Sequence, residues 1–326
     1  MVAVFDAPRG VFFMKKIVQF GPLFVVIAAL LWSVDGLLRI SLYTLPPSTV
    51  VFYEHVLGFL VLLLLSAKWL KDLRHMTKKE WFAIIIVALF SGALGTILYT
   101  AALQQINYTQ YSVVVLLQQQ LQPIWAIGTA AILLKEKLTK SFLVWAAVAL
   151  FAAYFITFKD LHVNLVTGAG TALAGFLSLS AGFMWGTSTA ISKFVLNKVN
   201  FLTGTAMRFF FAPFFAFLFL AAQNQTKSLF MLNSHQWVTL VIITLSTGMV
   251  AVAFYYYGLK KTPARITTLC ELVWPASAIF IDYFLYHKTL SFTQIFGVLL
   301  LLLAIYKITQ PLKGKSESLS EEFPHS

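Results

Sequence analysis

This chain has little charge and almost no cysteine. Its 326 residues include one cysteine, Cys270, and only 11% are charged, whereas about a quarter of a typical soluble domain is charged. Cys270 lies in an apolar segment, which argues against disulfides and cysteine metal sites. The chain has no cluster of His, Cys, Asp or Glu at metal-ligand spacing, no P-loop and no G-x-S-x-G motif. We therefore expect no cofactor and no bound metal.

Apolar residues are abundant instead. They make up 59% of the chain, phenylalanine alone contributes 31, and the mean hydropathy is +0.82. A net charge of +12 can indicate nucleic-acid binding, but here the lysines and arginines form short clusters between long apolar runs. That pattern is typical of membrane topology. We predict an all-α polytopic membrane protein that contacts the lipid bilayer and has no nucleic-acid partner.

The apolar runs divide into ten windows, each long enough for a transmembrane helix. The predicted spans are Phe20–Ile40, Thr49–Trp69, Trp81–Leu103, Gln110–Leu134, Ser141–Phe158, Gly170–Phe194, Phe201–Gln223, Trp237–Leu259, Ala264–Tyr286 and Phe292–Ile308. With the amino terminus inside, 19 of the 24 lysines and arginines fall on the inner side, four on the outer side and one inside a span. We therefore expect both termini in the cytoplasm and the protein in the cell membrane. Residues 1–19 and 310–326 are predicted to be cytoplasmic segments, the second of them disordered.

The two halves of the chain, residues 20–158 and 159–309, repeat each other. Corresponding positions are Trp32 and Trp185, His55 and Arg208, Ser91-Gly92 and Thr247-Gly248, Tyr99 and Tyr255, Gln119 and Glu271, Gln122-Pro123 and Trp274-Pro275, and Lys135-Glu136 and His287-Lys288. Because each half has five spans, an odd number, the second half must be inverted relative to the first. Inverted repeats around a central site are common in secondary transporters.

These paired motifs resemble those of the drug/metabolite transporter superfamily, specifically its EamA-type members. The resemblance covers about residues 23–308 and implies a ten-helix exporter or metabolite carrier that works without ATP. It does not name the substrate. The sequence departs from the usual family pattern at His287-Lys288, where a glycine–glutamate pair is common, and at His55, where arginine is more frequent.

The fourth span carries an unusual polar stretch. Gln118, Gln119, Gln120 and Gln122 precede Pro123 inside an otherwise apolar run. Glutamine has no hydrogen-bond partner in lipid, so this face must look into protein or water. We interpret the stretch as the wall of a polar cavity. Helical spacing groups Gln118 and Gln122 with Gln119 beside them, whereas Gln120 points away and is expected to be structural.

Ionisable residues at membrane depth are costly and usually face the interior of the helix bundle. From the topology, Asp35, Glu54 and His55 should lie in the outer half with the glutamines, and Arg208 and Glu271 in the inner half. We therefore predict two polar clusters on opposite sides of a central cavity, with these five residues as candidates for gating or proton coupling. A histidine titrates near physiological pH and so could carry a proton.

Spacing and depth indicate which of these ionisable residues should pair and which should not. Arg208 and Glu271 are expected to pair, either as a gate or substrate-carboxylate site or as a permanent ion pair between two spans. Asp35 and Arg39 are four residues apart and can pair on one helix face. Glu54 and His55 are adjacent, hence about 100° apart around the helix, and are not expected to face one spot.

Aromatic residues complete the predicted cavity. Trp32, Trp185 and Trp274 could present ring faces to a planar or cationic substrate, together with Tyr99 and Tyr255. Interior packing, or anchoring at the membrane interface for Tyr255, explains the same residues about as well.

The function favoured by the sequence is secondary transport of a small polar or amphipathic metabolite by alternating access of the two repeats. Neutral amides favour a zwitterionic or uncharged solute, so an amino acid is the first expectation. A lipid-like substrate carrier or flippase is the alternative, and a membrane enzyme or passive channel is less favoured. The sequence leaves open the substrate, the direction of transport, the coupling ion and the oligomeric state.

Overall fold

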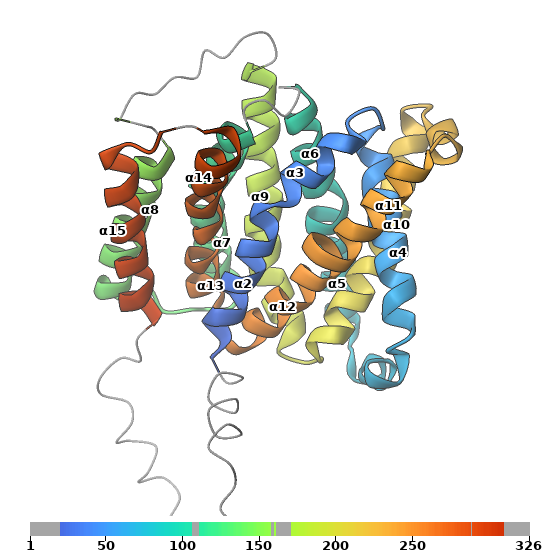
Figure 1. Ribbon diagram of the computed structural model, residues 1–326. Helices are drawn as coiled ribbons and strands as arrows, with labels where there is room; N and C mark the ends of the chain where they lie inside the picture. Colours follow the sequence, from blue (N-terminus) through green and yellow to red (C-terminus); the bar gives the residue numbers. More distant parts are fainter. Residues whose placement is uncertain (1–19, 106–110, 158–159, 161–170, 288, 310–326) are drawn as a thin grey trace, which may run out of the picture.

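The computed structural model describes residues 20–105, 111–157, 160, 171–287 and 289–309, and it describes residues 111–120 as helix without placing their side chains. The described residues are mainly helical and contain no strand. The predicted cytoplasmic segments 1–19 and 310–326 lie outside these ranges. Figure 1 shows the helices standing side by side, with the start of the first labelled helix and the end of the last at the same end of the molecule.

Each half of the chain contributes one set of helices. In the first half these are α2 (Gly21–Ser33), α3 (Asp35–Arg39), α4 (Pro47–Leu63), α5 (Lys78–Val87), α6 (Gly95–Gln105), α7 (Tyr111–Leu133) and α8 (Lys140–Thr157). In the second half they are α9 (Thr171–Leu196), α10 (Phe201–Ala222), α11 (Ser234–Ile243), α12 (Met249–Lys261), α13 (Ala264–Cys270), α14 (Val273–Tyr286) and α15 (Phe292–Thr309).

Local sequence explains where several of these helices begin. Thr77 and Glu80 form a reciprocal capping box at the start of α5, and Asn233 and Gln236 form the corresponding one at α11. Proline begins α4 at Pro47, where the missing N–H costs nothing. Each cap satisfies backbone donors that would otherwise be left unpaired at a helix start.

Six helical segments of the described residues are long and apolar enough to cross a membrane. A seventh is counted if α4 is joined to the short 3₁₀ turns at Ser66–His75, which bend away from it by 75°. This bend corrects the predicted span Thr49–Trp69, whose helix ends at Leu63. Helix lies in each of the ten predicted windows, but ten membrane crossings stay a prediction.

Two breaks interrupt helices next to ionisable residues. The first separates α2 from α3 at Val34, just before Asp35. The second separates α13 from α14 at Glu271 and Leu272. Pro275 has no N–H to offer the carbonyl of Glu271 four residues earlier, and that carbonyl accepts from Trp274 N instead, at 2.9 Å.

Matching positions of the two halves share two unusual conformations. The helix widens into a π-turn at Ala88–Leu94 between α5 and α6, and again at Thr244–Gly248 between α11 and α12. These turns contain the pairs Ser91-Gly92 and Thr247-Gly248 that align in sequence. Lys135 and His287, which also align, both have positive φ, at 53° and 52°.

Helices of one half pack mainly against helices of the other. α2 packs on α12, and α6 packs on α9. Because α9 is the counterpart of α2 and α12 is the counterpart of α6, the second contact repeats the first with the halves interchanged. α4 packs on α10, and α8 packs on α15 at one edge of the molecule (Figure 1). The reciprocal packing places the centre of the molecule between the halves.

The halves are also joined at the end where α2 begins and α15 ends (Figure 1). The carboxylate of Glu136, after α7, accepts from the backbone N–H of Ala264 at 2.7 Å and of Arg265 at 3.1 Å, and pairs with the Arg265 guanidinium at 3.2 Å. Two lysines nearby join α9 to α12 within the second half. Lys193 Nζ donates to the carbonyl of Leu259, and Lys260 Nζ donates to that of Leu196. Each lysine thus satisfies a carbonyl at the end of the other's helix.

Candidate binding cavity

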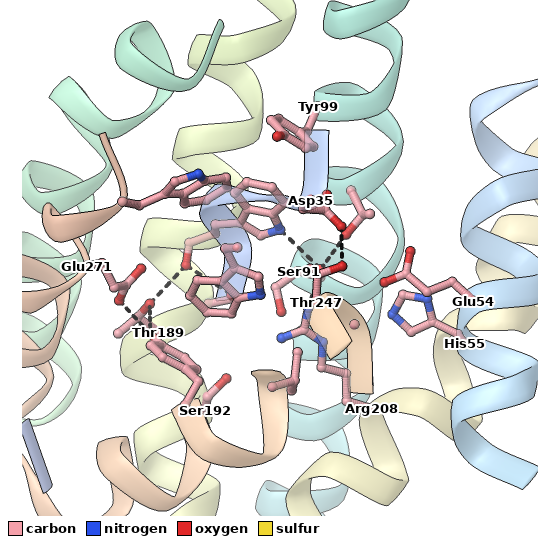
Figure 2. A pocket seen from close by; sticks show the side chains of 18 of the residues that line it. Asp35, Glu54, His55, Ser91, Tyr99, Thr189, Ser192, Arg208, Thr247 and Glu271 are labelled. Carbon is pink, nitrogen blue, oxygen red and sulfur yellow. Dashed lines mark hydrogen bonds between the residues drawn. The ribbon is translucent and has the colours of Figure 1, made fainter. Parts of the chain in front are cut away.

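A cavity lies between the two halves and is lined by residues of α2, α3, α4, α6, α7, α9, α10, α12, α14, both π-turns and the α13–α14 break (Figure 2). The space open to the centres of water molecules is about 80 Å³, enough for several waters. The predicted site residues that line it are Trp32, Asp35, Glu54, His55, Tyr99, Gln122, Trp185, Arg208, Tyr255, Glu271 and Trp274. The side chains of Gln118, Gln119 and Gln120, also named from the sequence, lie outside the described residues.

Five aromatic rings form one continuous surface of the cavity. The ring centroids of Trp32 and Tyr255 lie 5.2 Å apart. Their counterparts in the repeat, Trp185 and Tyr99, have ring centroids 5.4 Å apart, so each pair joins one residue from each half. Trp274 lies 5.9 Å from Trp32 and from Tyr99 and 6.2 Å from Trp185, so it joins the two pairs. We call these five residues the aromatic cluster.

A carboxylate–arginine cluster lies where α3 meets α4. Arg39 Nε donates to Asp35 at 2.5 Å and Arg39 Nη2 to Glu54 at 2.8 Å, and all three side chains are buried. Thr247, in the second π-turn, donates to the other Asp35 oxygen at 2.6 Å. The predicted pairing of Asp35 with Arg39 is therefore present, and Glu54 extends it to two carboxylates on one cation.

Glu271 lies in a neutral hydrogen-bonding environment. Its two oxygens accept from Gln122 Nε2 at 2.6 Å and from the Tyr255 hydroxyl at 2.9 Å. The Tyr255 hydroxyl also lies 2.9 Å from Thr189 Oγ1. The side chain of Glu271 is 2% exposed, and it has no ion-pair partner among the described residues.

The predicted pairing of Arg208 with Glu271 is wrong. Arg208 Nη2 donates to the backbone carbonyl of Ser91 at 2.8 Å. The π-turn makes this carbonyl available to side chains, and Trp185 Nε1 donates to it as well, at 3.2 Å. A backbone acceptor, which no side-chain pattern reveals, has taken the place of the expected carboxylate.

His55 stacks on Phe209 with ring centroids 4.5 Å apart, and its Nδ1 lies 2.9 Å from the Val51 carbonyl. A carbonyl only accepts, so Nδ1 carries the proton of this bond. Glu54 and His55 have different partners, as expected of adjacent helical residues, yet both line the cavity (Figure 2). The cavity wraps around α4 far enough to include two adjacent side chains.

The predicted separation into an outer and an inner polar cluster is also wrong for Gln122. This residue was assigned to the outer group, yet it donates to Glu271 of the inner group. The two groups meet in one cavity because α7 packs against α13 and α14. Depth along a helix, which the topology gave, does not determine which helices are neighbours.

Comparison with known proteins identifies the family. Residues 19–158 and 172–310 match the EamA-like transporter family. The chain belongs to this family. It is 34% identical to the riboflavin transporter ImpX of Fusobacterium nucleatum over 292 residues, 89% of this chain and 97% of that protein. A solved structure titled only as a crystal structure of a protein has the same fold, with a TM-score of 0.65 at 16% identity, covering 88% of this chain and 95% of the other.

This EamA-like transporter has further cavity residues that sequence reasoning missed. They are Ser91, Thr96, Ser188, Thr189, Ser192, Phe209, Thr247, Gly248 and Val252, besides Arg39, which was noticed only as a partner of Asp35. Serine and threonine in apolar helices commonly bond their own backbone, so their presence alone gives no signal. The repeat does give a signal for two of these segments, because Ser91-Gly92 and Thr247-Gly248 occupy matching positions in the two halves.

Proposed function

We propose that this EamA-like transporter carries riboflavin or a closely related flavin across the cell membrane. The observation that carries the proposal is the aromatic cluster on the wall of a buried cavity, next to hydrogen-bonding groups. Riboflavin is uncharged and combines a flat three-ring system with a polyol chain. A wall of aromatic rings suits the first part, and buried carboxylates, amides and hydroxyls suit the second.

The relatedness to a protein named as a riboflavin transporter supports the same substrate class, at 34% identity over nearly the whole length of both chains. An amino acid, the first expectation from the sequence, has less support. That expectation rested on glutamine amides, and Gln122, the one whose side chain is described, is engaged with Glu271.

We further propose that transport proceeds by alternating access of two inverted five-helix repeats, residues 20–158 and 159–309, with ten membrane crossings and both termini in the cytoplasm. The matching π-turns and the reciprocal packing of α2 on α12 and α6 on α9 support this arrangement. The cavity lies between the halves, so their relative movement would open it first to one side of the membrane and then to the other.

Protons are the coupling ion we propose, with Glu271 as their carrier. A buried carboxylate without a cation at membrane depth is far less costly when protonated. Its partners Tyr255 and Gln122 connect it to the aromatic cluster and to α7, so substrate binding and protonation would act on the same groups. Import and export are both compatible with this arrangement.

Uptake of riboflavin into proteoliposomes tests the proposal. We expect saturable uptake by the wild type, and Trp274→Ala should reduce uptake at least about tenfold, because it removes the ring that joins both aromatic pairs. The matched control is Trp125→Ala, since Trp125 is 43% exposed and lies outside the cavity. Absence of riboflavin uptake by correctly folded wild type, or equal losses in the two variants, would contradict the proposal.

A further inference from the structure

Three polar groups in the cavity retain unused hydrogen-bonding capacity. Among the described residues, Arg208 Nε, Ser91 Oγ and His55 Nε2 are buried without a hydrogen-bond partner. Their side chains are 9%, 3% and 1% exposed, and all three line the cavity. Buried polar groups are nearly always paired, so three unpaired ones in one place indicate where a ligand binds.

The three groups lie around one point, at Gly92 of the first π-turn. A methyl group placed on Gly92 would lie 3.6 Å from Arg208 Cγ and 3.7 Å from His55 Nε2. Arg208 also holds the Ser91 carbonyl, which fixes the guanidinium beside Ser91. Figure 2 shows Ser91, the guanidinium of Arg208 and the imidazole of His55 in the same part of the cavity. At Gly92 itself the helices pack closely, with Ala212 Cβ 2.7 Å from that methyl position, so the open space is the cavity that all three side chains line.

Each of the three unpaired atoms can be assigned as a hydrogen-bond donor or acceptor. Arg208 Nε can only donate, and the Ser91 hydroxyl can donate or accept. The N–H at His55 Nδ1 donates a hydrogen bond to the Val51 carbonyl, so Nε2 of the neutral ring is an acceptor. The site therefore offers two donors and one acceptor, and no carboxylate of the described residues forms an ion pair with Arg208.

We propose that Arg208, Ser91 and His55 form the subsite for a cyclic imide edge, in which an N–H lies between two carbonyl groups. This inference rests on the proposed function, because the flavin ring system carries such an edge. The two carbonyl oxygens accept from Arg208 and Ser91, and the imide N–H donates to His55 Nε2. A carboxylate or phosphate fits less well, since it has no proton for His55 and would lie near the Glu54 carboxylate.

The subsite is placed to orient a stacked ring. Trp185 belongs to the aromatic cluster and also donates to the same Ser91 carbonyl that Arg208 holds. A flat ring system lying against Trp185 therefore has one edge at this subsite. The polyol chain of a flavin then extends towards Glu271, which lies on the opposite side of the cavity from His55 and accepts from the Tyr255 hydroxyl (Figure 2).

Competition for riboflavin uptake by wild type tests the inference without any variant. Lumiflavin, which keeps the imide edge but lacks the polyol, should compete. N3-methylriboflavin, in which the imide N–H is blocked, should compete at least about tenfold more weakly than riboflavin, because a buried acceptor is left unpaired. Equal competition by the methylated compound would overturn the subsite and leave riboflavin transport standing, as would stronger competition by a phosphorylated flavin. Absence of riboflavin transport by wild type would remove both.

Variants of His55 locate the effect. We expect His55→Ala to lose most of the discrimination against the methylated compound, and His55→Gln to keep part of it, because glutamine retains an acceptor oxygen. His235→Ala is the matched control, since His235 is exposed at the start of α11 and outside the cavity. Unchanged discrimination in His55→Ala would assign the effect elsewhere and overturn the subsite.

Discussion

At the scale of single residues, Arg39 is the charge on which a buried cluster depends. Its guanidinium forms ion pairs with two carboxylates, Asp35 of α3 and Glu54 of α4, which are 5% and 4% exposed. An intact buried ion cluster adds little net stability, because desolvation offsets much of the attraction. Removal of the cation is a different matter, since it leaves two like charges together in a low-dielectric region.

We expect Arg39→Ala to destabilise the folded protein by about 3–5 kcal/mol, as is usual when one partner of a buried ion pair is removed. Thermal unfolding of detergent-purified protein measures the loss. Adding Asp35→Asn and Glu54→Gln to Arg39→Ala should restore part of it. Arg74→Ala, on the exposed turn after α4, is the control and should change little. A triple variant no more stable than Arg39→Ala would argue against charge repulsion as the cause.

Residue pairing is also where prediction from sequence was least successful. The Asp35–Arg39 pair followed from helical spacing alone, and the structure has it. The partners of Arg208 and Glu271 did not follow, because one is a backbone carbonyl and another, Gln122, lies in the opposite half of the chain. Tyr255 is closer to Glu271 in the chain, on α12, but it is one of three consecutive tyrosines. Depth in the membrane narrows the choice of partners without fixing it.

At the scale of elements, close helix packing depends on particular glycines. A methyl group on Gly58 of α4 would lie 2.5 Å from Phe209 Cδ1 and 3.1 Å from Met249 Cβ. Phe209 is fully buried and stacks on His55, so it has little room to move. The contact between α4 and α10 joins matching helices of the molecule's two halves.

Gly58→Ala is expected to destabilise the protein by about 1–3 kcal/mol through overpacking. Gly128→Ala is the matched control, because a methyl group on Gly128 of α7 has nothing within 4 Å. There the substitution should be neutral or stabilising by up to about 1 kcal/mol, since alanine favours helix. Thermal unfolding compares the two, and equal shifts would contradict the packing argument.

The helices themselves were predictable because long apolar windows leave few alternatives in a membrane. Their irregularities were less so. The break before Pro275 follows from a missing N–H, whereas Pro123 lies inside the continuous helix α7. The π-turns at Ser91-Gly92 and Thr247-Gly248 have no local signature, and only their duplication in the two halves marks them.

At the scale of the whole molecule, the contacts of Glu136 with Ala264 and Arg265 join the first half to the second. Under the proposed alternating access these contacts must break when that end of the molecule opens. Cys270 reports on this movement, because it is the chain's one cysteine, is 1% exposed and lies on α13, the helix that Glu136 holds at its start.

We therefore expect Glu136→Ala to raise the rate at which a small thiol reagent modifies Cys270 in membranes by several fold. Riboflavin should alter that rate if it shifts the balance of states. Glu80→Ala is the control, because Glu80 caps its own helix at the same end without joining the halves. An unchanged modification rate in Glu136→Ala would show that these contacts do not hold the end closed.

The Ser91 carbonyl has a genetic consequence. Because the main chain supplies this acceptor, Ser91→Ala retains it, and in a mutational scan this change would register the loss of the hydroxyl alone. The scan should instead detect this part of the cavity at the neighbouring glycines. A methyl group on Gly92 would lie 2.7 Å from Ala212 Cβ, and one on Gly95 would lie 2.5 Å from Trp185 Nε1. We expect alanine at positions 92 and 95 to disturb the packing around this carbonyl, whereas Ser91→Ala should lose only the contact of its hydroxyl with the proposed imide edge.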